Sequence, residues 1–255
     1  MVIAIVTGAS SGMGRTFVRA IAERCEVDEV WAIARRADRL EALAAETVVP
    51  VRALPLDLAA DVSYDELGAL LEREAPGVLY LVNAAGLGSI GTWKTVPQKD
   101  VDAMIDVNCR ALVRMTQLVL PHMVRGGHVI ELASCSAFTP LPHLNVYAAS
   151  KAFVQSYTRS LRWELFGTGI CATAVCPAWV RTEFVSVAQQ GSGAADIRHF
   201  PLAQKPETVV RRALWANRMH FAVACCGVPA FLLRIVGKFL PHCVTIAGWE
   251  GLRRL

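Results

Sequence analysis

The chain contains 255 residues, of which 54% are hydrophobic and 19% are charged, and its formal net charge is +4. This size and composition are typical of one α/β domain with a large core, and they exclude an intrinsically disordered protein. The positive charges form no basic block, so we expect no nucleic-acid partner.

Short apolar runs alternate with segments of helical periodicity along the chain. The runs typical of buried parallel strands cover residues 2–8, 29–35, 51–58, 78–83, 128–133 and 170–176. The segments typical of helices cover residues 14–25, 37–46, 63–74 and 97–123, and Asn145 is expected to cap a further helix. This alternation predicts an α/β fold, a doubly wound parallel β-sheet of about seven strands with helices on both faces. No linker or repeat interrupts the pattern, so we expect residues 1–255 to form a single domain.

The first expected strand runs directly into a glycine-rich loop. Residues 7–14 read Thr-Gly-Ala-Ser-Ser-Gly-Met-Gly and join this strand to the first helix. Glycines permit a tight turn and the close approach of a ligand, and free N–H groups at a helix start attract phosphate. The strand–loop–helix context predicts a dinucleotide-binding loop made of Gly8, Ser10, Ser11, Gly12, Met13 and Gly14. A purely structural turn is the alternative interpretation.

The ends of the next two strands indicate which dinucleotide is bound. A carboxylate about 20 residues after the loop would contact the 2′-hydroxyl of NAD, but the chain has Arg35 and Arg36 there. Guanidinium groups make paired hydrogen bonds to phosphate, so these arginines favour NADP(H) over NAD(H). Solvated arginines at a helix start are the alternative. Asp57 and Leu58 end the third strand and are expected near the adenine, although Asp57 could equally cap the following turn.

A tyrosine and a lysine form the candidate catalytic pair. Tyr147 and Lys151 are four residues apart, so on a helix they share one face. A free tyrosine holds its proton to about pH 10, and a neighbouring ammonium lowers that pKa and suits the phenol for general acid/base work. Ser134, at the end of the fifth strand, could hold a substrate oxygen opposite the phenol. The spacing alone also occurs by chance in many proteins.

These elements together resemble the short-chain dehydrogenase/reductase family over about residues 2–182. The family motif Thr-Gly-x-x-x-Gly-x-Gly matches residues 7–14, Asn-Ala-Ala-Gly matches residues 83–86, and Tyr-x-x-x-Lys matches residues 147–151. The resemblance implies a Rossmann-type fold and an oxidoreductase that moves hydride between NADP(H) and a carbonyl or secondary alcohol. It also implies cofactor contacts at Asn83, Ala84, Gly86, Tyr147, Lys151, Pro177, Val180 and Thr182.

The resemblance assigns a role to each candidate catalytic residue. Tyr147 would be the general acid/base, and Ser134 would orient the carbonyl. Lys151 would hold the nicotinamide ribose and lower the Tyr147 pKa, while Asn108 would position a water in a proton relay. A non-catalytic sensor of the NADP(H) ratio is the rival hypothesis, but such a sensor needs no acid/base group.

Two departures from the family pattern concern the substrate end of the chain. Ala178 replaces the glycine of the family's Pro-Gly segment, and the chain lacks the Val-Asp-Gly-Gly ending associated with tetramers. Instead, residues 229–255 form an amphipathic extension, in which the helix at 229–241 could cover the pocket, form a dimer contact or lie on a membrane surface. Packing within the protein or a homodimer is favoured, and peripheral membrane contact stays open.

The expected substrate pocket is apolar. Its walls would come from the segment 183–205 together with Ser134, Phe138, His143, Trp179 and Phe184. Such walls favour a hydrophobic ketone, for example a steroid-like or acyl ketone.

The remaining sequence features concern metals, redox state and membranes. The eight cysteines form no Cys-x-x-Cys pair and no zinc spacing with the histidines, so we expect no metal and a reduced, cytoplasmic protein. No signal peptide fits the first residues. The uncharged stretch 219–233 has 15 residues and includes Pro229, which is too short for a transmembrane helix of about 20 residues.

Overall fold

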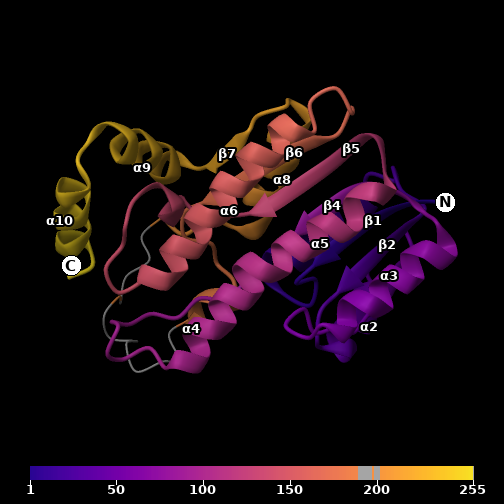
Figure 1. Ribbon diagram of the computed structural model, residues 1–255, viewed down its shortest axis with the longest axis horizontal. Coiled ribbons are helices and arrows are strands. Elements are labelled where there is room, and N and C mark those ends of the chain that lie inside the picture. Colours follow the sequence, from indigo (N-terminus) through magenta and orange to yellow (C-terminus); the bar gives the residue numbers. More distant parts are fainter. Residues whose placement is uncertain (189–196, 198–201, 255) are drawn as a thin grey trace.

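The computed structural model describes residues 1–188, 197 and 202–254. Its centre is a seven-stranded sheet in the order β3-β2-β1-β4-β5-β6-β7, and all neighbouring strands are parallel (Figure 1). The strands are β1 (Val2–Thr7), β2 (Glu29–Ile33), β3 (Val51–Leu54), β4 (Gly77–Asn83), β5 (Met123–Leu132), β6 (Cys171–Pro177) and β7 (Val223–Cys226). The predicted Rossmann-type doubly wound fold is therefore confirmed.

Helices cover both faces of the sheet because the strands are apolar on both sides. Ala4 and Val6 of β1 pack with α1 (Gly12–Ala22), α2 (Ala37–Ala44) and α8 (Pro206–Arg218). Ile3 and Ile5 of the same strand point the other way, towards α3 (Val62–Glu74), α5 (Leu112–Val119) and α6 (Asn145–Glu164). Successive residues of a strand face opposite sides, so one run of aliphatic residues contributes to two cores.

The strand order reverses direction between β1 and β4, and this point determines where a ligand can enter. The chain winds outwards from β1 to β3, then returns to β4 on the other side of β1 and continues to β7. In such sheets the crevice lies beyond the carboxyl ends of the strands, next to the reversal. The loops after β1, β4, β5 and β6 therefore surround one site.

The helix expected over residues 97–123 is divided into several parts. It consists of α4 (Gln98–Ile105), a π-helical turn (Asp106–Ala111), α5 and a 3₁₀ turn (Leu120–His122). A single π-turn within an α-helix often marks a functional site, and here it contains Asn108. Strand β5 already begins at Met123, whereas the sequence pattern placed the start of this strand at residue 128.

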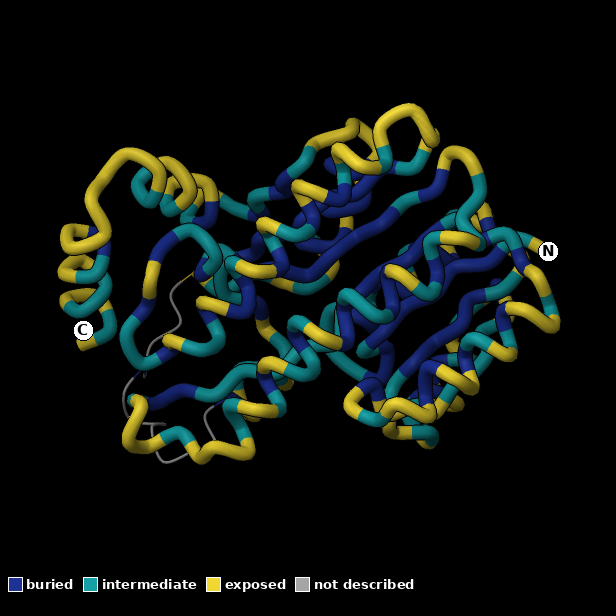
Figure 2. Tube along the Cα trace, viewed as in Figure 1, coloured by how far each residue is buried: buried dark blue, intermediate teal, exposed yellow. Residues whose placement is uncertain are grey.

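The C-terminal segment extends beyond the sheet. After β7, which the sequence pattern had not located, α9 (Val228–Phe239) and α10 (His242–Leu252) project from one end of the molecule (Figure 1). Many positions of these two helices are exposed (Figure 2). Within the described part of the chain, no helix is long and apolar enough to cross a membrane. The short helices α7 (Glu183–Ala188) and Cys135–Phe138 complete the surroundings of the site.

Candidate active site

The loop after β1 is a cradle shaped by its glycines. Gly8 and Gly12 have φ angles of +67° and +50°, which side-chain-bearing residues rarely adopt. A Cβ atom on Gly14 would lie 2.2 Å from the carbonyl oxygen of Gly8, so a side chain there would clash with the backbone. The Thr7 hydroxyl accepts a hydrogen bond from the Ala85 backbone N–H at 3.1 Å and joins this loop to the loop after β4. The backbone and the start of α1 can thus approach a phosphate group.

Arg36 lies directly beside this cradle. Its Nε and Nη2 atoms donate to the Ser10 hydroxyl at 3.3 and 3.1 Å, and Nη1 lies 3.3 Å from the Glu183 carboxylate. Arg39, on the next turn of α2, donates to the same carboxylate at 2.7 Å. Arg39 first, and then Arg36, lowers the pKa of Glu183. These ion pairs are exposed and contribute little to stability, so the guanidinium groups can exchange Glu183 for a 2′-phosphate.

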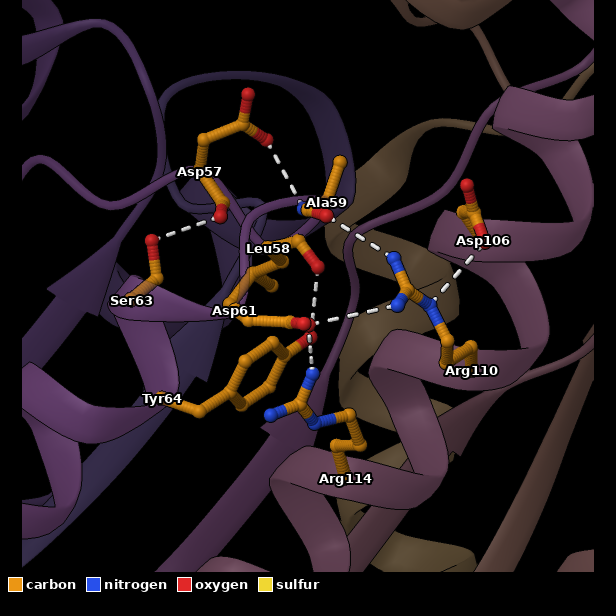
Figure 3. A network of polar contacts seen from close by, with 9 residues as sticks. All are labelled: Asp57, Leu58, Ala59, Asp61, Ser63, Tyr64, Asp106, Arg110 and Arg114. Atoms are coloured by element: carbon orange, nitrogen blue, oxygen red, sulfur yellow. Dashed lines mark hydrogen bonds and ion pairs between the residues drawn. The ribbon is translucent and has the colours of Figure 1, made fainter.

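A polar network fastens the loop after β3 to the helix at 106–119 (Figure 3). Asp57 Oδ1 accepts a hydrogen bond from the Ala59 N–H at 3.0 Å, so this carboxylate caps its own turn. Arg110 donates to the Ala59 carbonyl at 3.0 Å and pairs with Asp61 at 3.4 Å. Arg114 also pairs with Asp61. The network holds the loop at the edge of the crevice.

Ser134, Tyr147 and Lys151 meet at the end of β5. Ser134 follows the strand, and its Oγ accepts a hydrogen bond from the Ser136 N–H at 3.2 Å. Tyr147 and Lys151 lie one turn apart on α6, and the Ser134 side chain is close enough to the Tyr147 phenol to lower its pKa. Lys151 is only 4% exposed, and its Nζ donates to the Leu132 carbonyl at 2.7 Å. The strand end and the helix together therefore orient all three groups.

Burial dominates the acidity of the Tyr147 phenol. It raises the pKa of Tyr147 above the ordinary tyrosine value, and the Ser134 side chain opposes this shift. Burial also lowers the pKa of Lys151 to about 8. The Lys151 Nζ lies 5.9 Å from the centre of the Tyr147 ring and is bound to a backbone carbonyl. The lowered Tyr147 pKa that we expected from Lys151 is therefore not found here, because desolvation of the phenol is the largest influence and raises the pKa.

These groups share one cavity of about 1470 Å³. The expected cofactor residues that line it are Gly8, Ser10, Ser11, Gly12, Met13, Gly14, Arg35, Arg36, Asp57, Leu58, Ala84, Gly86, Tyr147, Lys151, Pro177, Val180 and Thr182. A Cβ atom on Gly12 would lie 3.2 Å from the Thr182 side chain, so the loop after β1 and the loop after β6 are in contact beside the cavity. The glycine cradle and the acid/base group are thus parts of the same crevice.

Comparisons with known proteins identify this arrangement. The family model described as short chain dehydrogenase matches residues 2–192. The chain belongs to the short-chain dehydrogenase family. Over 210 residues it is 38% identical to sulfoacetaldehyde reductase 2 of Chromohalobacter salexigens, covering 76% of this chain and 78% of that protein. It is 34% identical to an NADP-dependent 3-hydroxy acid dehydrogenase of Salmonella typhi, with coverage of 84% and 88%.

Solved structures show the same similarity in three dimensions. A short-chain dehydrogenase from Sphingobium yanoikuyae in complex with NADPH matches with a TM-score of 0.80 and 29% identity, covering 93% of both chains. The closed form of a serine dehydrogenase complexed with NADP⁺ matches with a TM-score of 0.78 and 31% identity, covering 88% of this chain and 94% of that one.

Two asparagines expected at this dehydrogenase site lie behind the cavity rather than in its lining. The Asn108 amide donates to the Leu87 carbonyl at 2.9 Å and to the Ser150 hydroxyl at 3.0 Å, and its Oδ1 accepts from the Leu87 N–H at 2.8 Å. Asn108 therefore holds the loop after β4 to α6. A Cβ atom on Gly86 would lie 3.3 Å from both Asn108 Oδ1 and Lys151 Nζ, which places the asparagine next to Lys151.

Asn83 has a similar supporting position and does not line the cofactor cavity. Its Nδ2 donates to the Thr116 hydroxyl at 3.0 Å and to the Glu131 carboxyl at 3.1 Å. The sequence interpretation overlooked Glu131, although a lone acidic residue within the apolar run at 128–133 was a visible signal. Glu131 is fully buried, and burial raises its pKa to about 8.

The structure places some of the residues predicted for the substrate pocket in the cavity and others outside its lining. Ser134, Trp179 and Phe184 line the cavity, but Phe138 and His143 do not. Phe138 packs beneath α9, because its carbonyl lies against Gly237. His143 has its Nε2 3.9 Å from Glu250 of α10. Of the expected 183–205 segment, residues 189–196 and 198–201 lie outside the described residues, whereas Ile197 and Leu202 line the cavity.

The two C-terminal helices form a wall that motif reasoning could not assign. The lining residues from α9, its C-terminal end and α10 are Pro229, Leu233, Val236, Leu240, Val244, Thr245, Gly248, Trp249, Leu252 and Arg253. Trp249 Nε1 donates to the Pro142 carbonyl at 2.8 Å, which attaches α10 to the loop before α6. Covering the pocket was one of the three roles considered for the helix at 229–241. The face of α9 that carries Pro229, Leu233 and Val236 covers the cavity.

Proposed function

We propose that the protein is an NADP(H)-dependent oxidoreductase that interconverts a carbonyl and a secondary alcohol. The observation that carries this proposal is that Ser134, Tyr147 and Lys151 share one cavity with the glycine cradle and Arg36. The NADP-dependent dehydrogenase and the NADPH and NADP⁺ complexes among the similar proteins support the choice of cofactor.

The described residues fit an NADP(H) molecule, whose nicotinamide would supply or accept the hydride. The positive φ angles of Gly8 and Gly12 and the close contact at Gly14 leave room for a diphosphate beside α1. Arg35 and Arg36 would hold the 2′-phosphate, which would take the place of Glu183 beside Arg36 and Arg39.

The acid/base step follows from the environment of Tyr147. Its phenol would donate a proton to the carbonyl oxygen during reduction and withdraw one from the alcohol during oxidation. Ser134 would share the same oxygen by hydrogen bonding, and charged Lys151 would stabilise the negative charge that develops on the phenol. Asn108 would support the proton relay by holding the Leu87 backbone and the Ser150 hydroxyl next to Lys151.

We propose a hydrophobic substrate, such as a steroid-like or acyl ketone. The walls contributed by Leu141, Leu144, Trp179, Phe184 and the C-terminal helices are mostly apolar. The relatives named above act on sulfoacetaldehyde and 3-hydroxy acids, which are small and polar, so the two substrate classes can be compared directly. A panel of both classes, assayed by NADPH and NADH absorbance, tests the proposal. Turnover of the small acids alone would contradict the hydrophobic class, and no turnover with any carbonyl would favour the non-catalytic NADP(H) sensor.

We further propose that residues 1–255 act as one domain, with 183–205 as the substrate loop and 229–255 as an extension. The free cysteines support a cytoplasmic site of action. Phe231, Leu232, Ile235 and Phe239 of α9 are 41–74% exposed. Burial of this apolar face would stabilise the protein, and we propose that a second copy of the chain covers it in a homodimer.

Light scattering and vesicle binding determine whether a second subunit or a membrane surface covers the exposed face of α9. A dimer that becomes a monomer in the double variant Phe231→Ser, Phe239→Ser would support a contact through this helix. The matched double variant Phe153→Ser, Trp163→Ser changes another exposed apolar face, on α6, and should keep that dimer. Arg234 and Lys238 adjoin the exposed face, so binding to anionic vesicles by a monomeric wild type would instead favour a membrane surface. A stable tetramer would contradict the dimer.

A further inference from the structure

A fully buried carboxyl group lies behind the catalytic lysine. Glu131 is 0% exposed and sits in the middle of the sheet, paired in register with Asn83 of β4 and Ala174 of β6. The next residue, Leu132, provides the carbonyl that binds Lys151 Nζ at 2.7 Å. An isolated buried carboxyl group is costly, so its retention beside the active site requires an explanation.

The hydrogen bonds of Glu131 satisfy only one of its two oxygens. Oε1 contacts Asn83 Nδ2 at 3.1 Å and Thr116 Oγ1 at 2.9 Å. Oε2 has no hydrogen-bond partner among the described residues. The Thr116 hydroxyl also lies 2.7 Å from the Leu112 carbonyl, and its single proton can serve only one acceptor. When that proton goes to Leu112, a proton on Glu131 completes the contact with Thr116. The site thus suits a neutral carboxyl group as well as an ionised one.

The groups facing Glu131 come from each element packed around it. Lys151 and Tyr157 lie on α6, Thr116 on α5 and Asn83 on β4. Burial first, and then Glu131, raises the pKa of Tyr157 to about 12, so this phenol stays neutral. Burial raises the pKa of Glu131 to about 8, and the nearby Lys151 acts against that shift.

Lys151 has two further neighbours that titrate. Cys109 from the π-turn and Cys176 from β6 also interact with it, but burial raises the pKa of both thiols, so they remain neutral near pH 7. Glu131 is therefore the group next to Lys151 that changes charge in the same pH range as the lysine. Two such groups lose their protons as a coupled pair.

We propose that Glu131 is a positioning residue for catalysis, whose carboxyl group behind the Lys151 anchor sets the pH range in which Lys151 stays charged beside Tyr147. When Glu131 ionises, its negative charge stabilises the Lys151 ammonium, and that ammonium favours the phenolate formed in the reaction. The inference rests on the proposed carbonyl reduction, in which Lys151 acts on Tyr147.

The pH profile of ketone reduction by the Glu131→Gln variant tests this role. Glutamine keeps the size of the side chain but carries no negative charge, so Lys151 should lose its proton at lower pH. We expect the high-pH limb of kcat/KM to move down by about one pH unit. The rate on the low-pH plateau should be retained, since Lys151 is charged there in both proteins. A purely structural role predicts equal loss at every pH, and this result would overturn the proposal. The Glu131→Asp variant keeps a carboxyl group, so the high-pH limb of its kcat/KM profile should lie close to that of the wild type.

Thermal unfolding provides a readout that does not depend on turnover. Native Glu131 retains its proton between about pH 4.5 and 8, where the unfolded chain has lost it, so its contribution to stability falls as pH rises through this window. The Tm of wild type relative to Glu131→Gln should therefore decrease from pH 5 to pH 8. A constant difference would overturn the proposal, even if no carbonyl substrate were found and the proposed function itself failed.

The wild-type protein gives the decisive measurement if the glutamine variant does not fold. Carboxyl ¹³C signals of labelled glutamate can be followed against pH in the native protein. One carboxyl group should titrate near pH 8, far above the ordinary glutamate value of about 4.3. Titration of every glutamate below about pH 6 would overturn the proposal, since Glu131 would then not change charge together with Lys151.

Discussion

The cofactor end and the substrate end of the cavity are built in different ways. Around the glycine cradle, the contacts are short and sterically strict, as the 2.2 Å approach at Gly14 shows. At the other end, α9 and α10 form a wall of mostly apolar side chains. Gly237 of α9 lies against the Phe138 carbonyl, but no atom lies within 4 Å of a Cβ built on Gly248, which lines the cavity on α10. A dinucleotide has the same shape in every turnover, so its site tolerates little change. The substrate wall can vary in sequence as long as it remains apolar.

The largest effect is expected where the two ends meet, at Tyr147. Tyr147→Phe removes the phenol proton but keeps the ring, whose centre lies 5.4 Å from that of Phe184. Turnover should fall by about 10²–10⁴-fold, the usual contribution of general acid/base catalysis. NADPH affinity, measured by fluorescence titration, should be unchanged. Retention of more than about a tenth of the wild-type kcat would contradict the assigned role.

The next largest effect separates the two cofactors. Arg36→Ala removes the guanidinium beside Ser10 and should weaken NADPH binding by about 10- to 100-fold, since a charge-assisted hydrogen bond contributes roughly 1.5–3 kcal/mol. NADH affinity should change little. Arg211→Ala is the matched control, because it removes an equal charge from an exposed position on α8 outside the cavity. Equal NADPH and NADH affinities in the wild type would mean that the arginines are merely solvated.

Adding a single methyl group at Gly14 tests how little room the packing at the cofactor end leaves. In Gly14→Ala the new Cβ collides with backbone atoms, which cannot rotate away. Overpacking of this kind costs about 1–3 kcal/mol, so the midpoint of urea unfolding should decrease and dinucleotide binding should weaken. An unchanged midpoint would show that the cradle is more adaptable than its geometry indicates.

The smallest effect is expected from the same change at the substrate end. Gly248 lies in α10, is exposed and lines the cavity. Gly248→Ala should stabilise the protein by about 0.5–1 kcal/mol, because alanine favours the helix more than glycine does and the new Cβ meets no atom. Dinucleotide affinity should not change. If the two glycine variants lose equal stability, the proposed difference between the two ends is wrong.

The sequence predicted the cofactor end in detail because its rules are local. The features that predicted it are the glycine positions, the apolar strand before them and two arginines, and each is recognised from a few neighbouring residues. The structure brings the glycines and the arginines to one cavity, as expected. The Tyr147–Lys151 spacing is also local, since one turn of helix orients both side chains. The roles of these residues in turnover remain predictions.

The substrate end depended on contacts between residues far apart in the chain. His143 was expected in the pocket, but it lies against Glu250, more than a hundred positions later in the chain. Phe138 is covered by α9. Which face of α9 lines the cavity and which is exposed depends on how the helix packs in the folded protein. Periodicity shows that a helix has an apolar face, but it does not show what that face will contact.

Charge states also required the tertiary structure. The sequence places Lys151 one turn from Tyr147, and this spacing alone predicted a lowered Tyr147 pKa. Folding removes water from both groups and adds Glu131 behind the lysine, so burial rather than the pairing determines the acidity of the phenol. Motif spacing therefore indicates which groups are candidates for the reaction, whereas desolvation, which depends on the whole surrounding core, decides the direction of their pKa shifts.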